Sequence, residues 1–186
     1  MAKEDKLVLS ITTIGDLLLY RKITNGDKPI ENIKLTVPPY QRPYKWTARN
    51  AIQLLDDIIE AKNSNKEKYR VGTLMLHKAE NSEVYNIVDG QQRTITFSLL
   101  LLALGEQSIP FLDEEVYLNK YNKTNIANNY NAFFRRVGIK DEESDVNLDH
   151  KREMQSLKGY ILKNCELIVV ITSDISEAFQ FFDSQN

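Results

Sequence analysis

The chain has 186 residues, of which 42% are hydrophobic and 27% charged, a composition that supports one folded domain and excludes wholesale disorder. Its 24 Lys and Arg residues and 26 Asp and Glu residues leave a net charge of −2, so it does not coat nucleic acid or a membrane through charge alone. The longest apolar run, residues 99–104, is too short to span a membrane, and residues 1–6 do not resemble a secretory signal. The single cysteine, Cys165, can form no internal disulfide. We therefore expect a cytoplasmic globular protein that makes no membrane contact.

Apolar residues recur with both the helical and the strand period, which predicts a mixed α/β domain. The elements expected in the first half are a helix over residues 14–22 after Thr13, a turn over 25–29, a strand over 33–37, an extended proline-rich segment over 38–46, and a helix that begins after Thr47. Strands over residues 71–77 and 83–88, joined by a polar turn, predict a hairpin.

The second half is predicted to be mainly helical. The expected elements are a buried helix over residues 91–104, a helix over 113–137, an acidic loop over 138–149, a helix over 150–163, a strand over 167–172, and a last helix from Asp174 or Ser176. The core face expected for the 113–137 helix consists of Val116, Tyr117, Ile126, Tyr130, Phe133 and Phe134.

We expect a single domain over residues 1–186, with a core of about residues 1–110 and 165–186 and a helical lobe of about residues 113–164. Because residues 181–186 are helix-like and lack a polar tail, we expect the chain to be part of a longer protein.

The sharpest motif is Asp89-Gly90-Gln91-Gln92-Arg93, where a predicted strand runs into a helix. Gly90 permits a tight turn or the close approach of a ligand, and the free N–H groups of the first helical turn attract an anion such as phosphate. Arg93 lies in that turn, where the helix dipole disfavours a cation, and a bound phosphate would compensate. Asp89 could cap the helix, orient Arg93 or hold a magnesium ion, and the two glutamines could bond a ribose, a base or an attacking water.

A structural interpretation of the same five residues stays open. Asp89 would then be only a helix cap, Gly90 only a turn, and Arg93 only the surface partner of Asp89. No Walker loop and no G-x-G-x-x-G sequence occurs in the chain.

The second motif is the stiff segment Tyr40-Gln41-Arg42-Pro43-Tyr44-Lys45-Trp46. Its aromatic rings could stack a base while Arg42 and Lys45 meet phosphate. Alternatively, Tyr44 and Trp46 anchor a loop on the core, which we favour for Trp46 considered alone. Because this segment and the Asp89–Arg93 motif both follow predicted strands, we expect Gln41, Arg42 and Tyr44 to line the same cavity as that motif.

The remaining candidates favour structural roles. His77 and His150 lie far apart and lack the carboxylate or cysteine spacing of a metal site. Cys165 precedes an apolar strand and is predicted to be buried, and the acidic run at residues 141–145 is expected to be solvated.

The two motifs, joined by a Leu-Leu-Asp-Asp-Ile helix at residues 54–58, together resemble the N-terminal domain of GmrSD-type, modification-dependent restriction proteins. The closing residues 182–186 are similar to a Phe-x-x-x-Asn stretch of that family. Residues 93–96 read Arg-Thr-Ile-Thr where Arg-Leu-Thr-Thr is common. The Gly90-to-Arg93 spacing also resembles sulfiredoxins and ParB proteins, although Gln91 stands where sulfiredoxin needs its cysteine, which argues against sulfinic acid repair.

The resemblance implies a ParB/sulfiredoxin-like α/β (α+β) fold, a mixed sheet with helical additions, that binds and hydrolyses a nucleoside triphosphate with Mg²⁺. It places the catalytic residues at Asp89, Gln91, Gln92 and Arg93, with Asp89 as the candidate Mg²⁺ ligand. The nucleotide, which could be GTP, UTP, CTP or ATP, would contact Gly90, Gln91, Gln92, Arg93, Gln41 and Arg42. Modified DNA would contact Tyr40, Arg42, Tyr44 and Trp46.

In such proteins a C-terminal HNH-type nuclease cuts the DNA, and with only two histidines this chain is not expected to cut DNA itself. We therefore expect an NTP-hydrolysing sensor domain that gates a nuclease and could form a homo-oligomer. The alternative is a non-catalytic module that binds modified DNA or a regulatory nucleotide, because phosphate affinity and phosphate hydrolysis use overlapping groups.

Overall fold

The computed structural model describes residues 7–24, 28–114, 123–139 and 145–185. The described residues include a five-stranded sheet in the order β1-β5-β3-β4-β2. Its strands are β1 (Leu7–Thr13), β2 (Lys34–Thr36), β3 (Tyr69–His77), β4 (Val84–Asp89) and β5 (Cys165–Thr172). The β1–β5 and β3–β4 pairs are antiparallel, and the β3–β5 and β2–β4 pairs are parallel, so the sheet is mixed as expected.

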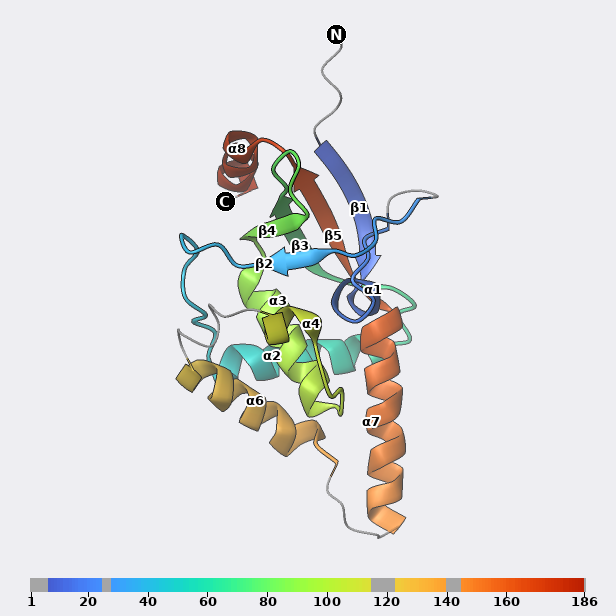
Figure 1. Ribbon diagram of the computed structural model, residues 1–186. Helices are drawn as coiled ribbons and strands as arrows, with labels where there is room; N and C mark the ends of the chain where they lie inside the picture. The colour runs from blue at the N-terminus through green and yellow to red at the C-terminus, as the bar shows by residue number, and fades with distance from the viewer. Residues whose placement is uncertain (1–6, 25–27, 115–122, 140–144, 186) are drawn as a thin grey trace.

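Most helices lie on one side of this sheet, and Figure 1 shows them stacked below it in the view. The described helices are α1 (Ile14–Leu18), α2 (Ala48–Asn63), α3 (Gln91–Ala103), α4 (Pro110–Glu114), α6 (Lys123–Val137), α7 (Asp145–Lys163) and α8 (Ile175–Gln185). Helix α8 lies apart from the others, and its Ala178 packs with Met75, Val88 and Val170 of the sheet (Figure 1). The sheet therefore separates a large apolar core from a small one.

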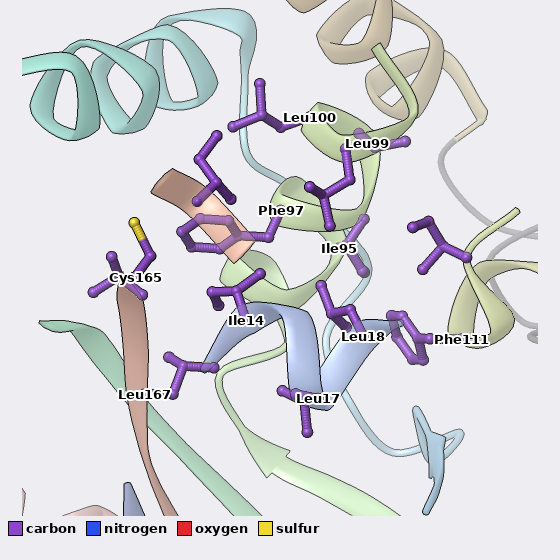
Figure 2. Packing of buried hydrophobic residues seen from close by; sticks show 14 of the residues in the cluster. Ile14, Leu17, Leu18, Ile95, Phe97, Leu99, Leu100, Phe111, Cys165 and Leu167 are labelled. Carbon is purple, nitrogen blue, oxygen red and sulfur yellow. The ribbon is translucent and has the colours of Figure 1, made fainter. Parts of the chain in front are cut away.

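Helix α3 runs through the main core, where its Ile95 and Phe97 are fully buried among residues of the sheet and of α1 (Figure 2). Its buried hydroxyl groups bond back one turn: Thr94 donates to Gly90 O (2.8 Å), and Ser98 donates to Thr94 O (2.8 Å). These bonds satisfy polar atoms that would otherwise be costly to bury. The N-terminus of α3 therefore belongs to a helix that is largely buried in the core.

Several sequence-based expectations are confirmed. Thr13 precedes α1 and its Oγ1 accepts a bond from the Asp16 N–H (3.2 Å), which makes it an N-cap. Strands β3 and β4 form the predicted hairpin, the strand expected at residues 33–37 is β2, and α3 begins at Gln91 as expected.

Other expectations need correction. Helix α7 begins at Asp145 rather than at 150, and the 113–137 segment is not described as one helix, since α4 ends at Glu114 and α6 begins at Lys123. Val116 and Tyr117 lie outside the described residues, as does most of the predicted turn at 25–29 and of the acidic run at 141–145. Within α6, Phe133 is buried as predicted, but Phe134 is 41% exposed and stacks on Tyr130.

Candidate functional site

The two sequence motifs meet at one cavity of about 480 Å³. It lies where β4 ends and α3 begins, beside the proline-rich segment and α8. The residues that line it are Tyr40, Gln41, Arg42, Trp46, Val88, Asp89, Gly90, Gln91, Gln92, Arg93, Phe179 and Asp183. The prediction that Gln41 and Arg42 line the same cavity as the Asp89–Arg93 motif is therefore confirmed.

Gly90 makes the turn from β4 into α3 in the left-handed backbone conformation, with φ of +103°. A Cβ at this position would stand 3.0 Å from both the Thr73 carbonyl oxygen and Leu74 Cδ1 on β3. Only glycine can combine this positive φ with such a close approach of β3 without strain. The turn presents the first N–H groups of α3, a helix of 13 residues, to the cavity that Gly90 and Gln91 line.

Arg93 is a half-buried cation whose charge the surrounding residues leave largely uncompensated. No carboxylate of the described ranges lies within 4.0 Å of its guanidinium, and its buried Nε has no hydrogen-bond partner there. Burial lowers the pKa of Arg93 from its usual value, an effect that the charges of Asp89 and Tyr69 only partly oppose. A half-buried guanidinium of this kind, in the wall of a cavity, is suited to bind an anion.

Asp89, the last residue of β4, interacts electrostatically with Arg93. Burial raises the pKa of its carboxyl group above the usual range, whereas the Gly90 N–H and the positive charge of Arg93 lower it. The desolvation effect is the largest of the three, so the net effect of the surroundings is to raise the pKa of Asp89.

The two glutamines of the motif occupy different environments. Gln91 is only 4% exposed, and its buried Nε2 has no partner among the described residues although the residue lines the cavity. Gln92 is fully engaged instead: its Oε1 accepts bonds from the N–H groups of Lys45 (2.8 Å) and Trp46 (3.1 Å), and its Nε2 donates to Pro43 O (3.2 Å). Gln92 thus holds the proline-rich segment, and in this conformation its oxygen is committed to backbone groups rather than to a water.

A second amide fixes the other end of the segment. The Gln41 Nε2 donates to the carbonyl oxygen of Val88 (3.0 Å), directly before the motif. Gln41 and Gln92 therefore join the two motifs through bonds between residues that are almost 50 positions apart in the chain.

Tyr44 does not reach the cavity, so the expectation that it lines the site is wrong. Its side chain is 1% exposed, and its hydroxyl accepts a bond from Asn129 Nδ2 (2.7 Å) and pairs with Thr96 Oγ1 (2.8 Å). Thr96 in turn donates to the Gln92 carbonyl oxygen (2.7 Å). A tyrosine followed by Lys45 and Trp46 gives no sign in sequence of which ring turns inward, because the partners are on α3 and α6.

Trp46 has both of the roles considered from sequence. Its half-buried ring packs against the main core and also lines the cavity, and its carbonyl oxygen accepts a bond from Asn129 Nδ2 (2.8 Å). Trp46 thus anchors the segment on the core and also contributes to the wall of the cavity.

Helix α8 supplies two cavity residues that the sequence analysis missed, Phe179 and Asp183. Phe179 is 41% exposed and Tyr40 is 54% exposed, and their ring centroids lie 6.2 Å apart at an interplanar angle of 60°. The sequence predicts a last helix from Asp174 or Ser176, but nothing in its pattern indicates that this helix packs beside Tyr40.

Among the described residues that line the cavity, the carboxylates that could hold a cation are Asp89 and Asp183. No group of three or more His, Cys, Asp or Glu residues in the described part of the chain could hold a metal. Mg²⁺ typically uses one or two carboxylates together with substrate phosphates, so the chemistry of these two residues fits a magnesium ion that is held jointly with phosphate groups.

The other candidates have structural surroundings. Cys165 is fully buried, which raises the pKa of its thiol to about 12. The His150 Nε2 lies 3.3 Å from Gly138 O, and the His77 Nδ1 is buried without a partner among the described residues. Within the described ranges, no helix combines the length and apolar character needed to cross a membrane.

The model of the family described as GmrSD restriction endonuclease, N-terminal domain, matches residues 18–186. The matched region contains the whole cavity, including both motifs and α8. No curated protein matches the chain.

Proposed function

Because the chain belongs to the GmrSD restriction endonuclease N-terminal domain family, we propose that it binds and hydrolyses a nucleoside triphosphate and thereby senses when a nuclease should act. The proposed setting is a modification-dependent restriction or anti-phage defence protein in which this domain controls the part that cuts DNA.

One observation carries the proposal: Arg93 is half-buried, lines the cavity, and has no carboxylate within 4.0 Å among the described residues. A phosphate group would compensate this charge and would also accept bonds from the free N–H groups at the start of α3. The unpartnered Nε2 of Gln91 is a further donor at the same wall. All three kinds of donor belong to residues that line the cavity, which supports the proposal.

Asp89 and Asp183 are the residues that would hold Mg²⁺ on the phosphates. When bound, the ion neutralises charge on the phosphate oxygens and favours attack by water. Asp89 is also the half-buried carboxylate next to Arg93, and it is the group we assign to hold the attacking water or take its proton. Gln92 supports the site indirectly, since its amide fixes the backbone of residues 43–46.

The aromatic rim supplies the second half of the proposed site. Tyr40, Trp46 and Phe179 line the mouth around the anion site, where a nucleobase or a modified DNA base could stack. Arg42 is exposed on the same wall and can meet a phosphate. We expect truncation of Tyr40 to weaken binding at every salt concentration, and Arg42→Ala to reduce the salt dependence of binding.

The alternative is a module that binds a nucleotide or a modified base without turnover. The engaged amide of Gln92 favours it, because its oxygen accepts backbone bonds from Lys45 and Trp46 and is therefore not free to position a water. Release of inorganic phosphate separates the two: hydrolysis predicts phosphate release that depends on Mg²⁺ with at least one of GTP, UTP, CTP and ATP. Binding without release would support the alternative.

Arg93→Ala is the decisive variant. Loss of charged hydrogen bonds to phosphate should cost roughly 1.5–3 kcal/mol per bond in binding, while the melting temperature should change little. Arg152→Ala, at an exposed position of α7, is the matched control. Equal nucleotide binding by Arg93→Ala and the parent protein would refute the phosphate site.

A further inference from the structure

A second hollow lies on the helical side of the molecule, between α2 and α6, with a volume of about 530 Å³. Its apolar lining consists of small or half-buried residues, Ala48, Ile52 and Ala132. None of the polar residues that line it is buried. The hollow is therefore an open surface rather than an enclosed pocket for a small molecule.

Three arginines and a single carboxylate surround this hollow. The carboxylate, Asp56, pairs with Arg136 at 2.8 Å, and both side chains are about half exposed. Arg49 and Arg135 are exposed, and no acidic group of the described residues lies within 4.0 Å of either guanidinium. The hollow thus carries a local charge of +2 on a chain whose net charge is −2.

The basic hollow continues toward the first cavity. Residues 42–49 border both: Arg42 and Trp46 line the cavity, while Ala48 and Arg49 line the hollow. Lys45 is exposed between them. Exposed cations at positions 42, 45 and 49 therefore follow one short segment from the cavity to the hollow.

We propose that the hollow formed by Arg49, Arg135 and Arg136 binds the phosphate backbone of duplex DNA. A free phosphate would need a closed set of buried donors, whereas exposed cations spread over a surface suit a polymer with regularly spaced charges. The proposal rests on the proposed function, in that it assigns to the DNA-sensing role a surface separate from the nucleotide cavity. It requires only backbone contacts, so binding here is independent of base sequence.

The test measures the binding of a fluorescein-labelled unmodified DNA duplex to the chain by anisotropy, between about 50 and 200 mM salt. The variant is Arg49→Gln/Arg135→Gln, which leaves the Asp56–Arg136 pair intact. The control, Lys151→Gln/Arg152→Gln, removes the same charge from exposed positions of α7. Phosphate release is measured on all three proteins.

The expected result for the Arg49/Arg135 variant is a dissociation constant raised about tenfold or more. The slope of log affinity against log salt should become shallower by roughly 1.8, the value for two lost phosphate contacts. The control should bind DNA within about twofold of the parent protein. Phosphate release should be the same in all three, because none of these residues lines the cavity.

Equal DNA binding by the parent and the Arg49/Arg135 variant would overturn this proposal and leave the nucleotide site unaffected. An equal loss in the α7 control would also overturn it, because the effect would then be one of net charge. If the parent protein does not bind the duplex at about 50 mM salt, the proposed backbone-binding surface fails. The phosphate-release assay would still decide the nucleotide role separately.

Discussion

The guanidinium of Arg93 lies directly over the backbone of Gly72 on β3. A Cβ at Gly72 would overlap with Arg93 Nη1 and stand 2.7 Å from Cζ, and Gly72 has a φ of +145°. The pairing of β3 with β5 shifts register between Arg70 and Gly72, which is the signature of a bulge. The strand thus makes room for the cation with a glycine at an irregular point of the sheet.

Gly72→Ala should therefore displace Arg93 and lower nucleotide affinity by about tenfold, which corresponds to ~1.4 kcal/mol. It should also reduce the stability of the domain by roughly 1–3 kcal/mol, because the new methyl group overpacks the site. Calorimetric titration with a nucleotide and a denaturant melt measure the two effects.

Gly105→Ala is a suitable control, because Gly105 also has positive φ (+103°) but a Cβ added there would meet no atom within 4 Å. It should cost about 1–2 kcal/mol of backbone strain without any change in nucleotide affinity. A Gly72→Ala protein that binds nucleotide as the parent does would show that the position of Arg93 is unimportant.

The pH dependence of the thermal stability of Asp89→Asn should reveal how much the partly buried charge of Asp89 destabilises the fold. Because burial raises the folded-state pKa of Asp89 above its ordinary value near 3.8, the stability linked to its proton is present at acid pH and is lost as the pH rises through the folded-state value. At neutral pH the variant should therefore melt at an equal or higher temperature than the parent. This advantage should shrink as the pH falls toward 4.

Thermal melts of both proteins over this pH range check the prediction, with Asp149→Asn, at an exposed position of α7, as the control. An advantage for Asp89→Asn that grows toward acid pH would contradict the assigned direction.

Tyr44→Phe should cost about 1 kcal/mol of unfolding free energy, since it removes one hydroxyl while Asn129 keeps Trp46 O and Thr96 keeps Gln92 O as partners. Tyr44→Ala should cost roughly 3–5 kcal/mol, because it also leaves a cavity where a ring is now fully buried. Chemical denaturation distinguishes them. Tyr40→Ala, at the exposed rim, should change the free energy of unfolding by no more than about 0.5 kcal/mol and should weaken ligand binding instead.

Cys165 should be inert to alkylating reagents in the native protein. With a pKa of about 12, only on the order of one thiol in 10⁴ is ionised at pH 8, and the side chain is fully buried. Iodoacetamide should therefore label Cys165 only after guanidinium unfolds the chain, as mass spectrometry can show. Rapid labelling of the native protein would mean that β5 opens readily.

The hairpin of β3 and β4, helix α2 and helix α3 could be predicted because the residues within each follow a local pattern. Strand β1 could not, because its pattern is inverted: Leu9 and Ile11 are exposed, while Ser10 and Thr12 face the interior. Ser10 donates to Thr24 O, and the Thr12 hydroxyl accepts from the Thr24 N–H, so the buried face is polar. The partner strand, β5, lies more than 150 residues away.

The candidate site could likewise be predicted only where its residues follow a local pattern. Local sequence indicates that a glycine turn places Arg93 in the first turn of a helix, and it suggests that Gln41 and Arg42 are nearby. It could not indicate the inward orientation of Tyr44, which depends on Asn129 of α6, or the contribution of Phe179 from α8. Each of these depends on packing between elements that are distant in the chain.

Several of the bonds that tie the proline-rich segment to the rest of the domain come from neutral amide groups: Gln41 to Val88 O, Gln92 to the backbone of residues 43–46, and Asn129 to Trp46 O. Amides neither titrate near physiological pH nor lose strength through ionic screening as exposed ion pairs do. The walls of the cavity should therefore keep the same shape from low to high ionic strength and across the pH range in which the protein is folded. Any salt or pH dependence in ligand binding would then report on the ligand's own contacts with charged groups such as Arg42, Asp89 and Arg93, and not on assembly of the cavity.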